Sequence, residues 1–163
     1  MEVNIYNLRG SDVGRSVTIT GTVEKVEVPH IKIQNAAFQC RRCGAIIKEP
    51  QEGEKLTIPL RCDKEQGGCG TARKNADFRL LEKQSEFLDM QKIKIEQFVK
   101  EGSSPFISGL LTGELVGSVE KEKFYEFMGD IYLSQDEKKS SRSFKFILKV
   151  KSIKPTTYDH PGV

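Results

Sequence analysis

Apolar residues alternate with polar ones along much of the chain, which is the pattern of half-buried β-strands rather than of helices. In the segment 16–28, apolar residues occupy every second position up to Val23, and the alternation then changes phase. One residue inserted near Glu24 and Lys25, as in a β-bulge, accounts for this change. Gly21 in the middle of the segment indicates a sharp bend. A long first strand that bends and changes face is typical of a small closed barrel.

The same alternation predicts further strands at 31–38, 78–81, 91–98, 106–111, 125–133 and 144–153. The last two form the clearest hairpin, because they flank the polar tip 134–143. In the final strand the apolar face carries Phe144, Phe146, Leu148 and Val150, and the basic face carries Lys145, Lys149 and Lys151. The pattern therefore predicts an all-β fold of five to seven short strands, with a metal-held insert between the early ones.

Length and composition narrow the class of protein. The chain has 163 residues, of which 37% are hydrophobic and 30% are charged. This length fits one domain, or one domain carrying a small insert, and the low apolar share predicts a thin core. No run of about 18 apolar residues occurs, so we expect no membrane span. The opening residues lack the pattern of a secretory signal, so we expect an intracellular protein of the cytoplasm or nucleoid.

Four cysteines form the strongest chemical signal in the chain. They lie in two pairs within one 30-residue window, at Cys40, Cys43, Cys62 and Cys69. Reduced intracellular thiols in close pairs indicate a metal site before they indicate disulfides. The first pair is a Cys-x-x-Cys-Gly knuckle, whereas six residues separate the second pair, which we interpret as an enlarged knuckle loop. We therefore predict one structural Zn²⁺ per chain, with iron–sulfur ligation and a labile redox pair as alternatives.

Positive charge is concentrated in the final hairpin. The segment 136–155 holds seven Lys and Arg against two Asp and Glu, so its net charge of +5 exceeds the +3 of the whole chain. Such a ribbon can follow the phosphates of a nucleic acid. The candidate DNA contacts are Lys138, Lys139 and Arg142 at the tip, Lys145 on the strand, and Arg41 and Arg42 in the first cysteine knuckle. The alternative is a solvated strand face whose lysines protect a sheet edge.

Four aromatic residues near this hairpin have two interpretations. Tyr125, Tyr132, Phe124 and Phe127 can stack on bases, as in single-strand binders, or can fill the core. Their apolar neighbours favour the core. Catalysis has no comparable signal, because there is no phosphate-binding loop of the Walker type and neither of the two histidines has a motif partner. A metal held by four sulfurs also has no open coordination position. We therefore predict no enzyme activity and no bound nucleotide.

Taken in order, five motifs resemble a known family over roughly residues 5 to 155. They are LRGSDVGRSVTITGTVEKV at 8–26, AAFQCRRCG at 36–44, SEFLDMQKIKIEQ at 85–97, LLTGELVGSV at 110–119 and FKFILKVKSI at 144–153. The order is similar to the N-terminal DNA-binding region of the minichromosome maintenance (MCM) replicative helicases, especially the archaeal ones. The resemblance implies a five-stranded OB-fold barrel with an inserted zinc ribbon.

The family also implies roles for particular segments. In that family the barrel drives ring formation, the zinc ribbons project from one end of the ring, and the hairpin contacts DNA in the central channel. Carried over here, the hairpin is 134–143, and the loop 97–105 matches the family's allosteric loop. The implied domains are the barrel at 1–38 and 78–155, the ribbon at 39–77 and a polar tail at 156–163. The family's helical domain and AAA+ motor are not expected in this chain, so helicase activity does not transfer.

The sequence thus predicts a non-enzymatic DNA-binding and ring-assembly module of an MCM-like replication protein. Its expected partners are single-stranded DNA, or DNA bound without sequence preference, and copies of itself in a homo-oligomer such as a hexameric ring, or a full-length MCM. One alternative is a protein-interaction module that regulates or caps an MCM helicase without touching DNA. Another is a different zinc-ribbon and OB-fold protein, such as a single-strand binder or translation factor, against which the motif at 85–97 argues.

Overall fold

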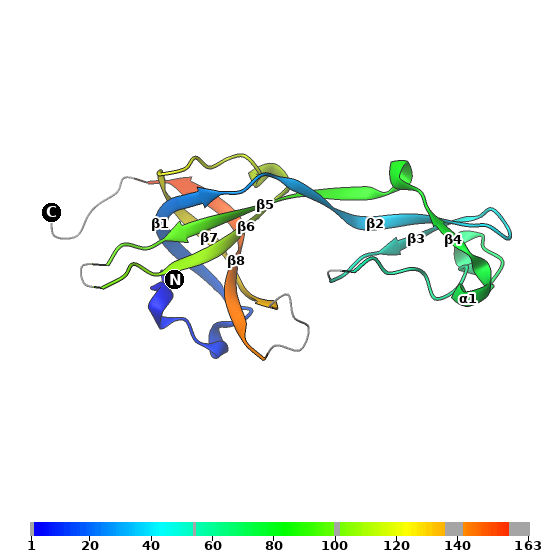
Figure 1. Ribbon diagram of the computed structural model, residues 1–163, viewed down its shortest axis with the longest axis horizontal. Coiled ribbons are helices and arrows are strands. Elements are labelled where there is room, and N and C mark those ends of the chain that lie inside the picture. The colour runs from blue at the N-terminus through cyan, green and yellow to red at the C-terminus, as the bar shows by residue number, and fades with distance from the viewer. Residues whose placement is uncertain (1, 54, 100–101, 136–141, 157–163) are drawn as a thin grey trace. The chain divides into compact units, whose positions relative to one another are not determined.

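The computed structural model describes residues 2–53, 55–99, 102–135 and 142–156, and β-strands dominate them (Figure 1). The chain forms two compact units. One comprises Met1–His30 with Asp89–Val163, and the other comprises Ile31–Leu88. No helix in the described ranges is long and apolar enough to cross a membrane. The boundaries inferred from the sequence at 38/39 and 77/78 stay a prediction.

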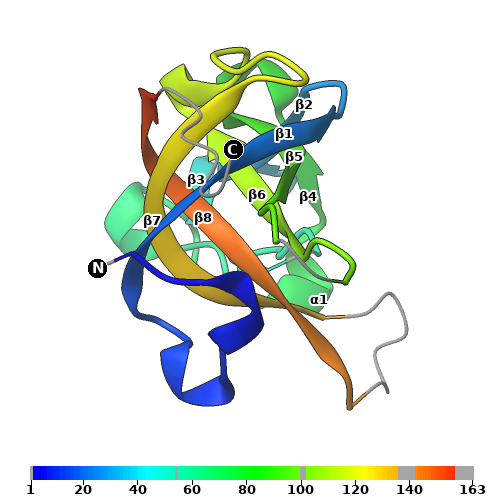
Figure 2. The same ribbon diagram turned by 90° about the vertical axis from the view of Figure 1, so that its left-hand side faces the viewer.

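The first unit is a closed barrel of five strands. These are β1 (Ser16–Val26), β5 (Glu86–Glu96), β6 (Phe106–Thr112), β7 (Phe124–Gln135) and β8 (Phe144–Pro155). β1 pairs with both β5 and β7, β5 pairs with β6, β6 with β8 and β8 with β7, which closes the circle. Only the β6–β8 pair among these is parallel, and Figure 2 shows β8 running beside β7. This is the architecture of the OB-fold.

A bulge and a glycine in β1 allow this strand to pair with two neighbouring strands. The β1–β5 register shifts between Val23 and Lys25, which confirms the predicted bulge near Glu24. Gly21 lies where the backbone of β5 is close to β1, since a Cβ there would stand 2.7 Å from the carbonyl oxygen of Glu96. Any larger residue would push the strands apart. The early part of β1 can therefore pair with β7 while its later part pairs with β5.

The barrel core is built by the inward residues of its strands. Its buried members include Ile19, Val23, Ile95, Leu111, Phe127, Ile131 and Leu148. Around the barrel the chain makes short 3₁₀ turns at Ile5–Asn7, Gly10–Asp12, Glu82–Gln84 and Gly113–Leu115. The last of these turns lies in the motif LLTGELVGSV. Gln97 fastens the N-terminal segment, because its side chain accepts from the Ile5 N–H and donates to the Val3 carbonyl.

The second unit is a small sheet around the cysteines. It contains β2 (His30–Cys40), β3 (Ile46–Pro50), β4 (Phe78–Leu80), the 3₁₀ turn Lys64–Gln66 and the one-turn helix α1 (Arg73–Ala76). β2 pairs antiparallel with both β3 and β4. Around the sulfurs its core consists of Cys40, Ile47, Cys62 and Ala76, with Ala45 and Phe78 packed against them, and Ala36, Ala37 and Phe38 are buried on β2. So few buried apolar side chains suit a unit that a metal ion stabilises.

The sequence predicts that the apolar face of the last strand, β8, is buried along its whole length, and this prediction is wrong at the start of the strand. Leu148 and Val150 are buried, and Lys145, Lys149 and Lys151 are exposed, as the alternation requires. Phe144, however, is 49% exposed. The reason is geometric, because the β7–β8 pair continues to Gln135 and Phe144, whereas β6 pairs with β8 only at positions 147–149. The first residues of β8 therefore extend past the barrel and have no core beneath them.

Candidate metal centre and nucleic-acid interface

The four cysteine sulfurs converge on one point. The Sγ atoms of Cys40 and Cys69 are 3.9 Å apart, those of Cys43 and Cys62 are 3.6 Å apart, and all four lie within 4.8 Å of one another. A tetrahedron of Zn–S bonds of about 2.3 Å places its sulfurs roughly 3.8 Å apart. None of the four forms a disulfide. The donor set and its spacing fit a closed tetrahedral metal site.

Backbone turns position the sulfurs of the first pair, Cys40 and Cys43. β2 ends at Cys40, and the chain turns back through Gly44, whose φ of 79° favours glycine. The Gly44 N–H donates to the Cys40 carbonyl, and the Ala45 N–H lies 3.4 Å from Sγ of Cys43. An N–H that points at sulfur stabilises a thiolate, as metal ligation requires.

The second pair uses the enlarged loop that the spacing predicts. Residues Lys64–Gln66 form a 3₁₀ turn, and Asp63 caps it by accepting from the Glu65 N–H. Gly68 closes the loop so tightly that a Cβ there would stand 2.4 Å from Sγ of Cys62. The loop then delivers the Cys69 N–H to Sγ of Cys62 at 3.3 Å. Although six residues separate Cys62 from Cys69, their two sulfurs therefore lie close enough to bind the same metal ion.

The pKa values of the two thiols in this second pair are shifted in opposite directions. Burial raises the pKa of the Cys62 thiol to about 12. The Thr71 hydroxyl, 3.1 Å from Sγ of Cys69, lowers the pKa of that thiol to about 6. Burial thus favours the neutral thiol at Cys62, whereas Thr71 favours the thiolate at Cys69.

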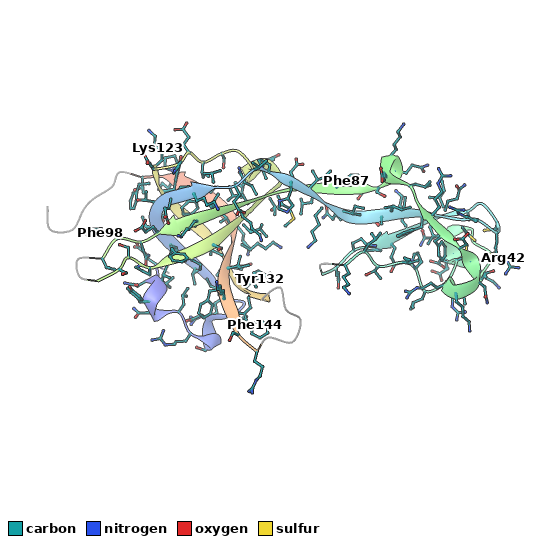
Figure 3. All side chains as sticks on the ribbon, in the orientation of Figure 1. Arg42, Phe87, Phe98, Lys123, Tyr132 and Phe144 are labelled. Atoms are coloured by element: carbon teal, nitrogen blue, oxygen red, sulfur yellow. The ribbon has the colours of Figure 1, made fainter. Side chains whose placement is uncertain are left out.

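The predicted DNA contacts lie in two places. Arg142 and Lys145 are exposed at the start of the strand β8, whereas Lys138 and Lys139 lie outside the described residues. Arg41 and Arg42 are exposed in the cysteine unit, where Figure 3 labels Arg42. Arg41 faces Asp77 at 3.6 Å, so a neighbouring carboxylate offsets part of its charge. The hairpin cations and the knuckle arginines belong to different units.

Of the four candidate stacking residues, two lie in the core, Phe124 is half-buried at the start of β7, and Tyr132 is exposed. Tyr125 and Phe127 are buried in the barrel, and the Tyr125 hydroxyl accepts from the Glu120 N–H. Tyr132 is 46% exposed on β7, on the same hairpin as the exposed Phe144 (Figure 3). Strand alternation separates them, because Tyr125 and Phe127 are at odd positions and Tyr132 is at an even one. The sequence favoured the core for all four and missed this exposed ring.

Two cation–π contacts were also not predicted. Nζ of Lys149 lies 5.5 Å from the centre of the Tyr132 ring, and Nζ of Lys94 lies 3.9 Å from the centre of the Phe106 ring. Each pair joins residues on different strands, so no local pattern reveals it. The sequence offered only one partial sign of them, the place of Lys149 on the polar face of its strand. Both contacts put a positive charge beside an accessible aromatic ring.

The fold and the four-cysteine site together define a class: OB-fold barrels that carry an inserted four-cysteine ribbon. The family described as "MCM OB domain" matches residues 4–132, so this chain belongs to that family. The barrel and ribbon match the crystal structure of the N-terminal domain of an archaeal MCM with a TM-score of 0.82. That match covers 96% of this chain and 62% of the other, at 24% identity.

Curated relatives include replication proteins from plants and fungi. The chain is 31% identical to the DNA replication licensing factor mcm6 of Schizosaccharomyces pombe over 116 residues, or 69% of this chain. It is 31% identical to the probable DNA helicase MCM8 of Arabidopsis thaliana over 98 residues, or 60% of this chain. In both cases the chain spans only 12% of the relative's length.

Proposed function

We propose that this chain is a non-enzymatic DNA-binding and ring-assembly module of an MCM-like replication protein. It contacts the DNA backbone through the basic hairpin, defined as the β7–β8 pair with its connecting segment 136–143. Membership of the MCM OB domain family supports a role in replication. The names of the matched relatives, a licensing factor and a probable helicase, agree with that role.

The observation that carries the proposal is the charge at the outer end of β8. Arg142 and Lys145 are exposed, and neither forms an ion pair with another residue in the described ranges. Lys149 is exposed too, but it lies opposite Asp130 in the β7–β8 register. A cation without a protein carboxylate beside it can neutralise a phosphate and release counterions. Backbone contacts of this kind carry no base code, so the binding is independent of sequence. Lys138 and Lys139 add two positive charges in the sequence between β7 and β8.

One Zn²⁺ per chain holds the cysteine unit in this proposal. Cys40, Cys43, Cys62 and Cys69 supply all four ligands, so the ion is structural. A rigid ribbon then presents Arg41 and Arg42 as secondary DNA contacts. The barrel is the part that assembles with copies of itself into a ring, or joins a full-length MCM. Light scattering after size exclusion, with and without a single-stranded oligonucleotide, tests this assembly by the appearance of discrete hexamers.

The proposal is tested by the salt dependence of DNA affinity. The variants Arg142→Ala/Lys145→Ala and Lys138→Ala/Lys139→Ala should each bind a fluorescent single strand more weakly. Each should also reduce the slope of log affinity against log salt, by up to about 0.7 per lost phosphate contact. Fluorescence anisotropy over a series of salt concentrations measures both quantities.

A matched control removes the same charge at the opposite end of β7. Lys121 and Lys123 are exposed and precede that strand, and Figure 3 shows Lys123 away from Tyr132 and Phe144. Lys121→Ala/Lys123→Ala should leave the affinity and the slope close to those of the unchanged protein. If the hairpin variants behave like this control, the hairpin does not bind DNA, and a protein-interaction module becomes the better account.

A further inference from the structure

The cysteine unit exposes large aliphatic side chains in the segment between β3 and the 3₁₀ turn at 64–66. Leu56, Ile58 and Leu60 are 50%, 40% and 75% exposed, whereas Pro59 between them is buried. A proline favours extended backbone in the residue before it, and alternate side chains of an extended chain lie on the same side. We call Leu56, Ile58 and Leu60 the apolar strip. Apolar residues exposed singly are ordinary, but a run of them marks an interaction surface.

Polar groups from elsewhere in the unit hold the backbone of the strip in place. The Gln51 side chain accepts from the Thr57 N–H at 2.7 Å and donates to the Thr57 carbonyl at 2.8 Å. Arg73 donates to the next three carbonyls, those of residues 58–60, twice through its guanidinium and once through its backbone N–H. The strip is therefore ordered without a partner, which lowers the entropy cost of binding one.

The same hydrogen bonds determine how a partner can bind. Every carbonyl from Thr57 to Leu60 already accepts a hydrogen bond, and Pro59 has no N–H to donate. An added β-strand needs open backbone donors and acceptors, so it cannot pair with this segment. A partner must contact the side chains instead, as the apolar face of an amphipathic helix does. Four residues of extended chain span about 13 Å, close to the roughly 12 Å between positions i and i+8 of a helix.

A cavity at one end of the strip can receive an anchoring side chain. Its volume is about 230 Å³, and it is lined by Leu56 together with Ile31, Lys32, Ile33, Gln51, Gly53 and Lys55. Sites for small molecules are larger, at roughly 300 to 1,000 Å³. The cavity therefore suits one apolar side chain of a protein partner, the kind of anchor that dominates many interfaces.

Positive charge borders the strip at both ends. Lys55 precedes it and Arg61 follows it, and both are exposed. The segment 55–61 contains no acidic residue, and neither cation forms an ion pair with another residue that the structure describes. Charge complementarity thus favours an acidic partner. The described ranges contain no α-helix besides the four-residue α1, so a second copy of them cannot supply the helix.

We propose that the apolar strip is a docking site for an acidic amphipathic helix of another protein. The apolar face of that helix lies along Leu56, Ile58 and Leu60, and one of its side chains enters the cavity. Its carboxylates pair with Lys55 and Arg61. This interaction is additional to the proposed binding of DNA and uses no residue of the basic hairpin.

The test uses a designed fluorescent peptide of about 20 residues, long enough to form a helix. It carries Leu at positions i, i+4 and i+8 of one face and Glu on either side of them. Anisotropy with the full zinc-loaded chain measures its affinity. Leu56→Gln and Leu60→Gln should each weaken binding by about 30-fold, the loss typical of a central anchor. Leu60→Met should retain most of the affinity. Phe87→Gln, at an exposed ring of the same unit outside the strip, is the matched control.

Two further arms test the charge and the fold. Lys55→Glu/Arg61→Glu should weaken peptide binding by about 10-fold at low salt and by less at high salt. The zinc content of the glutamine variants and their amide exchange in 31–88 should match those of the unchanged chain. If Leu56→Gln alters the fold, Ile31→Gln replaces it, since Ile31 is an exposed residue on the wall of the same cavity.

Three outcomes would overturn the proposal. The first is no binding of the acidic peptide up to about 1 mM. The second is equal binding of a peptide with the same composition in scrambled order, or an equal loss in Phe87→Gln. The third is strip-dependent binding to vesicles of anionic phospholipid in place of the peptide, which would make the strip a membrane contact. The glutamine variants remove no cation, so their affinity for single-stranded DNA should not change, and the proposed function is tested separately.

Discussion

Asp130 connects the middle of β7 to the strands on either side of it. Its carboxylate accepts a 2.6 Å hydrogen bond from the Ser16 hydroxyl on β1 and pairs with Lys151 on β8 at 2.8 Å. Lys151 and then Ser16 lower the pKa of Asp130 below its ordinary value of 3.8. A lowered pKa means that the folded state favours the charged carboxylate. The stability that results is fully present above the ordinary pKa and is lost as the pH falls through the folded-state pKa.

Asp130→Asn should therefore reduce the free energy of unfolding at pH 7, and the difference from the unchanged protein should shrink below about pH 4. Urea unfolding at pH 7 and pH 3 measures this. Asp89→Asn is the control, since that exposed carboxylate on β5 forms no ion pair within the described ranges. An equal loss at both pH values would show that Asp130 acts through packing instead of charge.

At the residue scale, sequence periodicity predicts on which side of a strand a side chain lies, but it does not predict how deeply that side chain is buried. The alternation correctly separates buried Leu148 and Val150 from exposed Lys149. It fails at Phe144, because it cannot tell how far a hairpin extends beyond its barrel. It also cannot reveal that Lys149 lies beside Tyr132, because the pairing of β7 with β8 fixes that contact.

At the scale of the element, the features that depend on nearby residues were predicted. The bulge in β1 follows from the phase change after Val23, and the long loop between Cys62 and Cys69 follows from their spacing. Non-local features were not predicted from the pattern alone. The parallel β6–β8 pair joins segments nearly 40 positions apart, and the resemblance to a known family, rather than periodicity, implied the OB-fold.

The cysteine unit should depend on its metal. Cys62→Ser should reduce the zinc content from one ion per chain to none and should accelerate amide hydrogen exchange in 31–88. Exchange in the β1–β7 pair should change little, since the barrel has its own core. Mass-spectrometric exchange and metal analysis measure both. Thr57→Ser, at an exposed site of the same unit, is the control, and full protection of 31–88 without zinc would contradict the prediction.

The whole molecule joins two units with different sources of stability. The barrel has an extensive apolar core, whereas the cysteine unit has few buried residues and four convergent sulfurs. Cationic side chains lie in both, at Arg142 and Lys145 on the barrel and at Arg42 in the knuckle. The family match covers 129 positions, 4–132, so it includes most of β7 but none of β8. The DNA-binding role that we propose for β8 therefore rests on the charge and exposure of that strand.

The most direct test of this account is a map of where DNA touches the chain. A single strand containing bromodeoxyuridine, cross-linked by ultraviolet light and analysed by peptide mass spectrometry, locates the contact. The account predicts cross-links on β7, β8 and the segment between them, within residues 124–155, that disappear as salt is raised. Cross-links confined to residues 31–88, or a yield that salt does not change, would contradict it.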